Sequence, residues 1–412
     1  MANIIGDVMI KLGAWFTTTT PLEARHFSSQ LNTKFIGADE SFSDHISNCR
    51  DMIRKVRSVS GSEDLSKIIV GNAPFELEPQ GKNTAGKDKA WRRGVLLTHG
   101  LSDSPYFMHH LAAFFQEEGF RVMAVLLPGH GTQPGDLLDV TWNEWVKAVA
   151  YGTDKIAAEA DEIYLAGYSA GGALSVYQSL QDKRVEGLFL FSPAFQISQL
   201  AAIAWTHKMV SWLFPRVKWV DIKPDNDLYK YESFAKNTAE QMYSLTEALN
   251  ERLQHHKLHI PIFAVASVDD KTVTTQATIE FMAKQLNPNN KFILYTTDLE
   301  LTSQKIPGEK IQWTSSIVPE QKIISSAHTA IVVAPEDKHY GIDGEYSNCI
   351  HYYPDEMEKY TFCSHNPKEC LQGEVTDEHL KLGVLRRLMY NPKFDMLKVS
   401  LKHFIVSLTS NK

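Results

Sequence analysis

Hydrophobic residues in the middle of the chain gather in short runs, most of them followed by a segment whose apolar positions have helical spacing. Runs without polar alternation are typical of strands buried on both faces of a parallel sheet. The alternation therefore predicts an α/β fold with a mostly parallel central sheet and helices on both faces. The expected strands are 94–98, 121–127, 161–166, 185–191 and 260–266, and the expected helices are 106–118, 170–181, 273–286 and one opened by a capping box at Thr141 and Glu144.

The alternation begins only after a polar loop at residues 80–89, and it breaks again between the fourth and fifth expected strands. The chain is longer than one α/β core needs, so we expect a core with additions to it. The expected parts are an N-terminal extension that packs on the core (1–85), the two halves of the core (86–194 and 259–345), a helical cap (195–258) and a C-terminal extension of helices and loops (346–412).

Composition and charge limit the classes of protein to which the chain can belong. The chain is 43% hydrophobic and 22% charged with a net charge of −7, which is typical of a globular protein and offers no basic surface for nucleic acid. We interpret the pairs Arg92-Arg93 and Arg386-Arg387 as solvated surface. No apolar run approaches the roughly 20 residues of a membrane-spanning helix. Composition predicts no oligomeric state.

The first 16 residues are apolar but contain Asp7 and lack a positively charged start. This pattern predicts an amphipathic helix and does not fit a signal peptide. We expect the helix to pack on the core, with peripheral membrane contact as the alternative. A cytoplasmic location is therefore expected.

Three of the four cysteines, Cys349, Cys363 and Cys370, lie close together in sequence, interleaved with His351 and His365. Their spacing lacks the tight Cys-x-x-Cys pairs of structural zinc sites, so no metal site is expected there. We favour free thiols and leave a local disulfide open as an alternative.

Residues 167–171 read Gly-Tyr-Ser-Ala-Gly, a G-x-S-x-G motif placed between an expected strand and an expected helix. In that setting the motif is typical of a sharp turn that holds a serine hydroxyl above the sheet. The start of the following helix adds positive potential where an oxyanion would form. We therefore predict that Ser169 is a nucleophile.

A second loop, His99-Gly100-Leu101, follows the first core strand. Acyl transfer needs two backbone N–H groups directed at the developing oxyanion. The residue after the nucleophile, Ala170, offers one of them, and Leu101 is the best candidate for the other. We expect His99 to have a structural role.

These motifs occur in the order His99 to Leu101, Gly129 to Gly131, and Gly167 to Gly171. In this order and spacing the chain resembles the monoacylglycerol lipase and bacterial carboxylesterase branch of the α/β-hydrolases, the branch that includes serine aminopeptidases of type S33. The resemblance covers about 94–195, resumes at 259–285 and near His328, and leaves out both ends of the chain. It implies an α/β-hydrolase fold with a cap, a catalytic triad in the chain order serine, acid, histidine, and a reaction without metal or organic cofactor.

The acid and the base must then follow the nucleophile. If Ala266 stands at the glycine of the family's G-x-x-D pattern, Asp269 is the acid, and a shift of one residue would make it Asp270. We prefer Asp269. His328, which follows the strand-like run 322–327, is the expected base. Because the chain carries an extra segment before it, either 291–297 or 322–327 can be the last core strand.

Aromatic residues at the start of the expected cap, Trp205, Trp212 and Phe214, are candidates for contact with an acyl chain, although they can equally pack the cap on the core. The favoured function is hydrolysis of a carboxylic ester, namely a lipid ester such as a monoacylglycerol or a lysophospholipid. The alternatives are a peptidase, an amidase or an acyltransferase of the same fold, or a non-catalytic interaction protein on a hydrolase scaffold.

Overall fold

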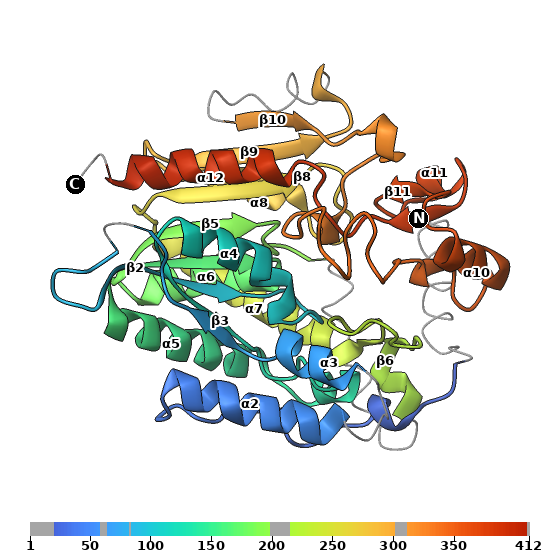
Figure 1. Cartoon of the computed structure of the whole chain (residues 1–412), viewed down its shortest axis with the longest axis horizontal. Helices are drawn as coiled ribbons and strands as arrows, with labels where there is room; N and C mark the ends of the chain where they lie inside the picture. Colours follow the sequence, from blue (N-terminus) through green and yellow to red (C-terminus); the bar gives the residue numbers. More distant parts are fainter. Residues whose placement is uncertain (1–19, 58–63, 82–83, 198–214, 301–310, 410–412) are drawn as a thin grey trace.

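An eight-stranded sheet forms the centre of the computed structural model (Figure 1), which describes residues 20–57, 64–81, 84–197, 215–300 and 311–409. Seven of the strands run parallel, and only the edge strand β1 pairs antiparallel with its neighbour β3. The strands are β1 (Phe75–Leu77), β2 (Trp91–Thr98), β3 (Arg121–Val125), β4 (Ala160–Tyr168), β5 (Val185–Phe191), β8 (Ile262–Ser267), β9 (Lys291–Thr296) and β10 (Ile311–Ser315).

The spatial order of the strands is β1-β3-β2-β4-β5-β8-β9-β10. The chain moves from β2 to β3 on one side and then returns to place β4 on the other side of β2. Parallel sheets of this kind bind ligands outside the carboxyl ends of the strands at such a reversal. The loops that follow β2 and β4 meet at this place.

Successive residues of the central strands enter opposite faces of the sheet. In β2, Leu96 packs in one hydrophobic cluster, whereas Val95 and Leu97 pack in the other. All three are fully buried. A buried side chain of this size contributes about 1.5–3 kcal/mol, so two apolar faces hold the sheet between two helical layers.

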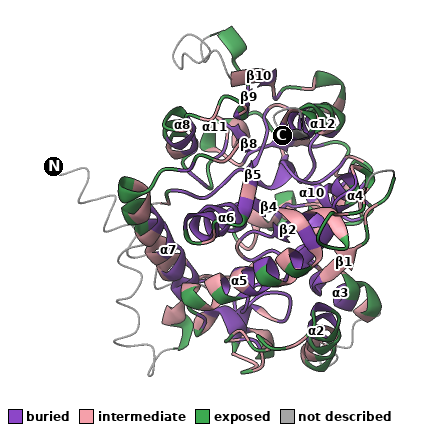
Figure 2. Cartoon of the chain, turned by 90° about the vertical axis from the view of Figure 1, so that its left-hand side faces the viewer, coloured by how far each residue is buried: buried purple, intermediate pink, exposed green. Residues whose placement is uncertain are grey.

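Helices cover both faces of the sheet (Figure 2). On one face lie α5 (Trp142–Glu159), α6 (Ala170–Gln181), α7 (Lys236–His255) and α8 (Thr275–Ala283). On the other face lie α4 (His109–Glu117) and α12 (Phe394–Thr409). This arrangement is the predicted α/β architecture.

The last core strands differ from both alternatives left open by the sequence. Residues 291–296 do form β9, but 322–327 form no strand, and only Ile323 makes an isolated bridge. The edge strand is instead β10, within the segment that looked like an insertion. The expected capping box is also absent, because the Glu144 carboxylate accepts the Phe35 N–H at 2.8 Å and so binds the N-terminal region.

The described part of residues 1–85 contains α2 (Phe42–Arg57) and α3 (Leu65–Asn72). Phe42 stacks on Tyr151 of α5, which places α2 beside that helix. Asn32 donates to the carbonyl of His130, in the loop after β3, at 2.7 Å. The first 16 residues, including the predicted amphipathic helix, lie outside the described residues.

Residues 215–258 contain a two-stranded ribbon, β6 (Trp219–Asp221) with β7 (Phe234–Ala235), followed by α7. α7 buries Met242, Leu245 and Leu249 in the same cluster as α6. This helix therefore packs as part of the layer over the sheet.

The C-terminal residues also reach the core. Phe404 of α12 makes ring contacts with Phe189 of β5 and Phe263 of β8, so α12 covers the centre of the sheet. Before it come α10 (Met357–His365), α11 (Asp377–Leu380) and a parallel pair, β11 (Leu371–Gly373) with β12 (Leu385–Arg387).

A disulfide joins Cys349 to Cys363, and only Cys370 of the three neighbouring cysteines is a free thiol. The expectation of free thiols was wrong for Cys349 and Cys363, because folding brings their Cα atoms to 6.0 Å, a separation that a disulfide spans. In the part of the chain that the structure describes, we find no helix both long and apolar enough to cross a bilayer.

Candidate active site

Ser169 lies in the sharp turn between β4 and α6. Its backbone has φ +54° and ψ −117°, a strained conformation for a residue with a side chain. The turn is possible because its glycines allow close packing: a Cβ on Gly171 would lie 2.1 Å from the carbonyl oxygen of Thr98. This geometry is that of a nucleophile elbow.

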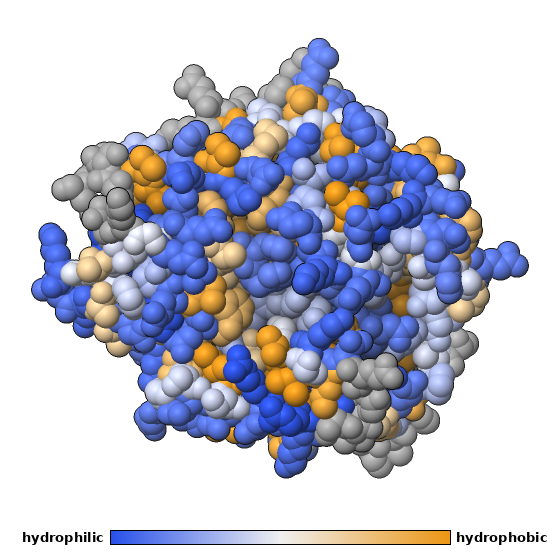
Figure 3. All heavy atoms as spheres, in the orientation of Figure 1, coloured by the Kyte–Doolittle hydropathy of each residue, from blue (hydrophilic) through white to orange (hydrophobic). Residues whose placement is uncertain are grey.

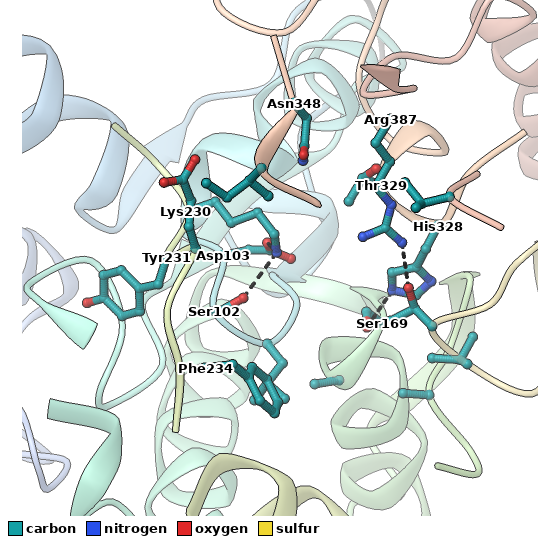
Figure 4. Close-up of a pocket in the computed structure, with 18 of the residues that line it drawn as sticks. Ser102, Asp103, Ser169, Lys230, Tyr231, Phe234, His328, Thr329, Asn348 and Arg387 are labelled. Carbon is teal, nitrogen blue, oxygen red and sulfur yellow. Dashed lines mark hydrogen bonds and ion pairs between the residues drawn. The ribbon is translucent and has the colours of Figure 1, made fainter. Parts of the chain in front are cut away.

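His328 meets this serine at the carboxyl edge of the sheet (Figure 4). Its Nε2 lies 2.9 Å from Ser169 Oγ, and its Nδ1 lies 2.6 Å from Asp270 Oδ2. All three residues are buried. Since an ionised carboxylate only accepts hydrogen bonds, the proton is on Nδ1, and Nε2 is free to accept the serine proton.

The structure pairs Asp270 with the histidine, where the sequence had favoured Asp269. β8 continues through Ser267, one residue beyond the alignment on Ala266, and the following turn directs the two carboxylates to different sides. Asp269 instead accepts hydrogen bonds from Ser316 Oγ at 2.5 Å and Thr297 Oγ1 at 3.2 Å, near the ends of β9 and β10.

Asp270 stays ionised although it is buried. Burial alone would raise its pKa, but the charge and hydrogen bond of His328 and the backbone N–H groups of Val273 and Thr272 lower the pKa below its usual value. Those two N–H groups donate to Oδ1 at 3.1 and 2.7 Å. The carboxylate is thus held to fix the imidazole.

The C-terminal region supports the same histidine. Glu374 accepts the backbone N–H of His328 at 3.1 Å. Arg387 pairs with Glu374 at 2.9 Å and donates to Thr272 Oγ1 at 2.7 Å. Glu374 could not be singled out from the sequence. The interpretation of Arg386-Arg387 as solvated surface was wrong, since Arg386 is buried and Arg387 lines the site.

Leu101 and Ala170, the residues predicted to bind an oxyanion, both line the cavity in front of Ser169. Ala170 is the first residue of α6, where a backbone N–H has no partner within the helix. A Cβ on Gly100 would lie 3.1 Å from that of Ser169, so this loop approaches Ser169 closely. The His99 side chain contacts the backbone at the ends of two strands, and its Nε2 accepts the Leu127 N–H at 3.0 Å. Burial keeps the pKa of His99 well below the usual value.

A cavity of about 470 Å³ opens in front of Ser169. Its apolar lining includes Ile197, Phe234, Met242 and Val273, and its polar lining includes Lys230, Asn348 and Arg387. Figure 4 shows Lys230 on one side of the site and Arg387 on the other, next to His328. Cavities of this volume accept small organic ligands.

The charged groups in the cavity are largely neutralised. Lys230 forms an ion pair with Asp103 and lies 3.1 Å from Ser102 Oγ. Burial raises the pKa of Glu232 to about 7, despite a hydrogen bond from Tyr346 Oη at 2.5 Å. Trp205, Trp212 and Phe214, the predicted acyl-chain contacts, lie outside the described residues.

With this geometry in place, the comparisons with known proteins assign a family. Residues 89–297, slightly more than half of the chain, match the hydrolase family described as serine aminopeptidase, S33. The chain belongs to this family. The predicted resemblance and the predicted α/β-hydrolase fold are therefore confirmed.

A thermostable monoacylglycerol lipase from Bacillus sp. (strain H-257) is 32% identical to this S33 family member over 109 residues. The match covers 26% of this chain and 44% of the lipase, so it spans less than half the length of that relative.

Two similar solved structures are a metagenome-derived lipolytic enzyme and a monoacylglycerol lipase from Paleococcus ferrophilus. The first is 20% identical, with a TM-score of 0.45, and the match covers 57% of this chain and 95% of that one. The second is 15% identical, with a TM-score of 0.42, and the match covers 54% and 88%.

Proposed function

We propose that this S33 family member hydrolyses carboxylic esters through an acyl-enzyme formed on Ser169. The observation that carries the proposal is the unbroken hydrogen-bond chain from Ser169 through His328 to Asp270. A serine hydroxyl with a neutral imidazole at its oxygen and a carboxylate behind that imidazole is activated for acyl transfer.

In the first half of the reaction, Ser169 Oγ attacks the ester carbonyl carbon while His328 Nε2 takes the serine proton. The Leu101 and Ala170 N–H groups bind the oxyanion. The bond to the alcohol breaks, and the alcohol leaves with the proton from His328. Water then attacks the acyl carbon and gives its proton to His328, and the acid departs as Ser169 regains its proton.

We propose a lipid ester as the substrate, and a monoacylglycerol in preference to a lysophospholipid. The apolar residues of the cavity can bury an acyl chain. Both cations of the lining have carboxylate partners, Lys230 in Asp103 and Arg387 in Glu374, so neither is free for a phosphate.

We further propose that the cap includes the ribbon β6–β7 and that residues 346–387 form the opposite wall of the substrate cavity. Lys230, Glu232 and Phe234 contribute from the first segment. The second segment contributes Tyr346, Asn348 and Arg387 to the cavity lining. The Cys349–Cys363 disulfide cross-links this segment.

A substrate panel tests this function. We expect turnover of p-nitrophenyl acyl esters and of a monoacylglycerol, slower turnover of lysophosphatidylcholine with the same acyl chain, and the slowest cleavage of aminoacyl p-nitroanilides. Ser169→Ala is the matched control and should cleave none of them. Faster cleavage of the anilides than of the esters would contradict ester hydrolysis and favour a peptidase.

A further inference from the structure

A second group of histidine and aspartate side chains lies outside the catalytic cluster. His109 and His110 begin α4, and Asp337 lies in the loop after His328. The Nε2 atoms of the two histidines lie 3.2 and 2.9 Å from the same oxygen, Asp337 Oδ2. Within the described residues this is a group of three ligand-type atoms that converge on one point.

The orientation of His109 directs one ring nitrogen at the carboxylate. Its Nδ1 faces the backbone carbonyl of Tyr106, which can only accept, so Nδ1 carries a proton. The other nitrogen, Nε2, faces the carboxylate oxygen Asp337 Oδ2. Nε2 is therefore the ring atom that can share a cation with Asp337.

An Nδ1–H bond to a backbone carbonyl is also what orients a metal-binding imidazole and fixes Nε2 as the ligand atom. The ligand separations agree with a metal site. Bond lengths of about 2.0–2.2 Å around a tetrahedral zinc ion place its ligand atoms roughly 3.3 Å apart. The distance from His109 Nε2 to Asp337 Oδ2, 3.2 Å, matches that value, and the distance from His110 Nε2, 2.9 Å, is shorter.

Asp337 is itself held in position. It is 4% exposed, and it accepts the backbone N–H groups of His339 and Tyr340 at 2.8 and 2.7 Å and the Tyr106 hydroxyl at 3.1 Å. The His109 side chain is 36% exposed, which leaves a route for an ion from solvent. The group thus combines a fixed carboxylate, two imidazoles and an accessible side.

We propose that His109, His110 and Asp337 bind one divalent transition-metal ion, with Nε2 of each histidine and Oδ2 of the aspartate as ligands. Two imidazoles and a carboxylate suit zinc, with water in the fourth position. The proposal does not depend on the hydrolase function.

The position of the ion defines its role. His109 ends the connection that begins at Gly100 and Leu101, and Asp337 lies nine residues after His328. An ion at this place joins the loop of the expected oxyanion hole to the segment that carries the base. It acts as a structural clamp, and it takes no part in proton transfer at Ser169.

Zinc binding to tag-free full-length protein tests the proposal. After treatment with a chelator, the protein is titrated with ZnCl₂ against a chromogenic competitor, and retained zinc is measured by mass spectrometry after desalting. We expect one zinc per chain and a higher melting temperature with zinc. His109→Ala and His110→Ala should each weaken binding by at least about tenfold, because even the residues that only support metal ligands commonly contribute that much.

His403→Ala, which removes an exposed histidine of α12, is the matched control and should bind zinc like the wild type. Circular dichroism verifies that each variant is folded. The Asp337 carboxylate is left intact because it also holds the backbone of its own loop. The proposal is overturned if the wild type retains no zinc, or if the His109→Ala/His110→Ala double variant binds zinc as tightly as the wild type. Either result would make the cluster an ion pair of protonated histidines with Asp337.

Discussion

Two of the places where histidine meets a buried aspartate differ in which ring nitrogen faces the carboxylate. His328 turns Nδ1 to Asp270 and Nε2 to Ser169. His109 turns Nδ1 to a backbone carbonyl and Nε2 to Asp337. In the first arrangement Nε2 faces an alcohol, and in the second Nε2 faces the carboxylate, where we propose a metal ion. The same residue types thus meet in two orientations, which differ in the partner of Nδ1.

Both aspartates have pKa values below the usual range. Burial would raise each pKa, but the facing histidines and the backbone N–H groups lower it by more. Glu232 has no histidine partner among the residues that the structure describes, and burial raises its pKa to about 7. The comparison shows that the partner, and not the burial alone, decides whether a carboxylate in this molecule is ionised.

Removal of the base should have the largest effect. His328→Ala leaves Ser169 without a proton acceptor, so we expect ester turnover to fall by about 10⁶-fold. The exposed His403→Ala serves as the control and should keep wild-type turnover. Initial rates with a p-nitrophenyl ester measure both. Retention of more than a hundredth of the activity in His328→Ala would mean that another group acts as base.

The two adjacent aspartates provide the next test. Asp270→Asn keeps the shape of the side chain but lets the imidazole take the wrong tautomer, and we expect kcat to fall by about 10⁴-fold. Asp269→Asn should change kcat by less than about tenfold, since its carboxylate binds Ser316 and Thr297. An equal loss in both variants would contradict the assignment of Asp270.

Whether a feature of the site could be predicted from the sequence depends on whether its residues lie close together in the chain. The nucleophile elbow was predictable because Gly167, Ser169 and Gly171 lie within one turn between a strand and a helix. The histidine could be placed from chain order. The choice between Asp269 and Asp270 could not be made, because it depends on where β8 ends and how its turn is oriented.

Contacts between residues that are far apart in the sequence could not be predicted for the same reason. Arg387 reaches the site only after β11 and β12 pair, and Asp337 meets His110 across more than 200 residues. The edge strand β10 was missed because its burial is partial and it therefore lacks a strong apolar run.

The smallest expected effect concerns the carboxylate of Glu232. Because the folded-state pKa of Glu232 is above the ordinary value of 4.5, the folded protein binds the proton more tightly than the unfolded chain. Stability is then full below about pH 4.5 and falls as the pH rises to about 7.

Glu232→Gln cannot ionise, so it should be more stable than the wild type by roughly 1–3 kcal/mol near pH 8 and about equal to it near pH 4.5. Urea unfolding at the two pH values measures this difference. A difference that is the same at both pH values would show that folding does not raise the pKa of Glu232.

The most direct measurement is intact-mass spectrometry after reaction with a serine-directed fluorophosphonate. The account predicts one adduct per wild-type chain, located at Ser169 by peptide mapping, a greatly slowed reaction in Asp270→Asn, and no adduct in Ser169→Ala. Failure of the folded wild type to react, or equal labelling of Ser169→Ala, would contradict the claim that Ser169, His328 and Asp270 form a working catalytic triad.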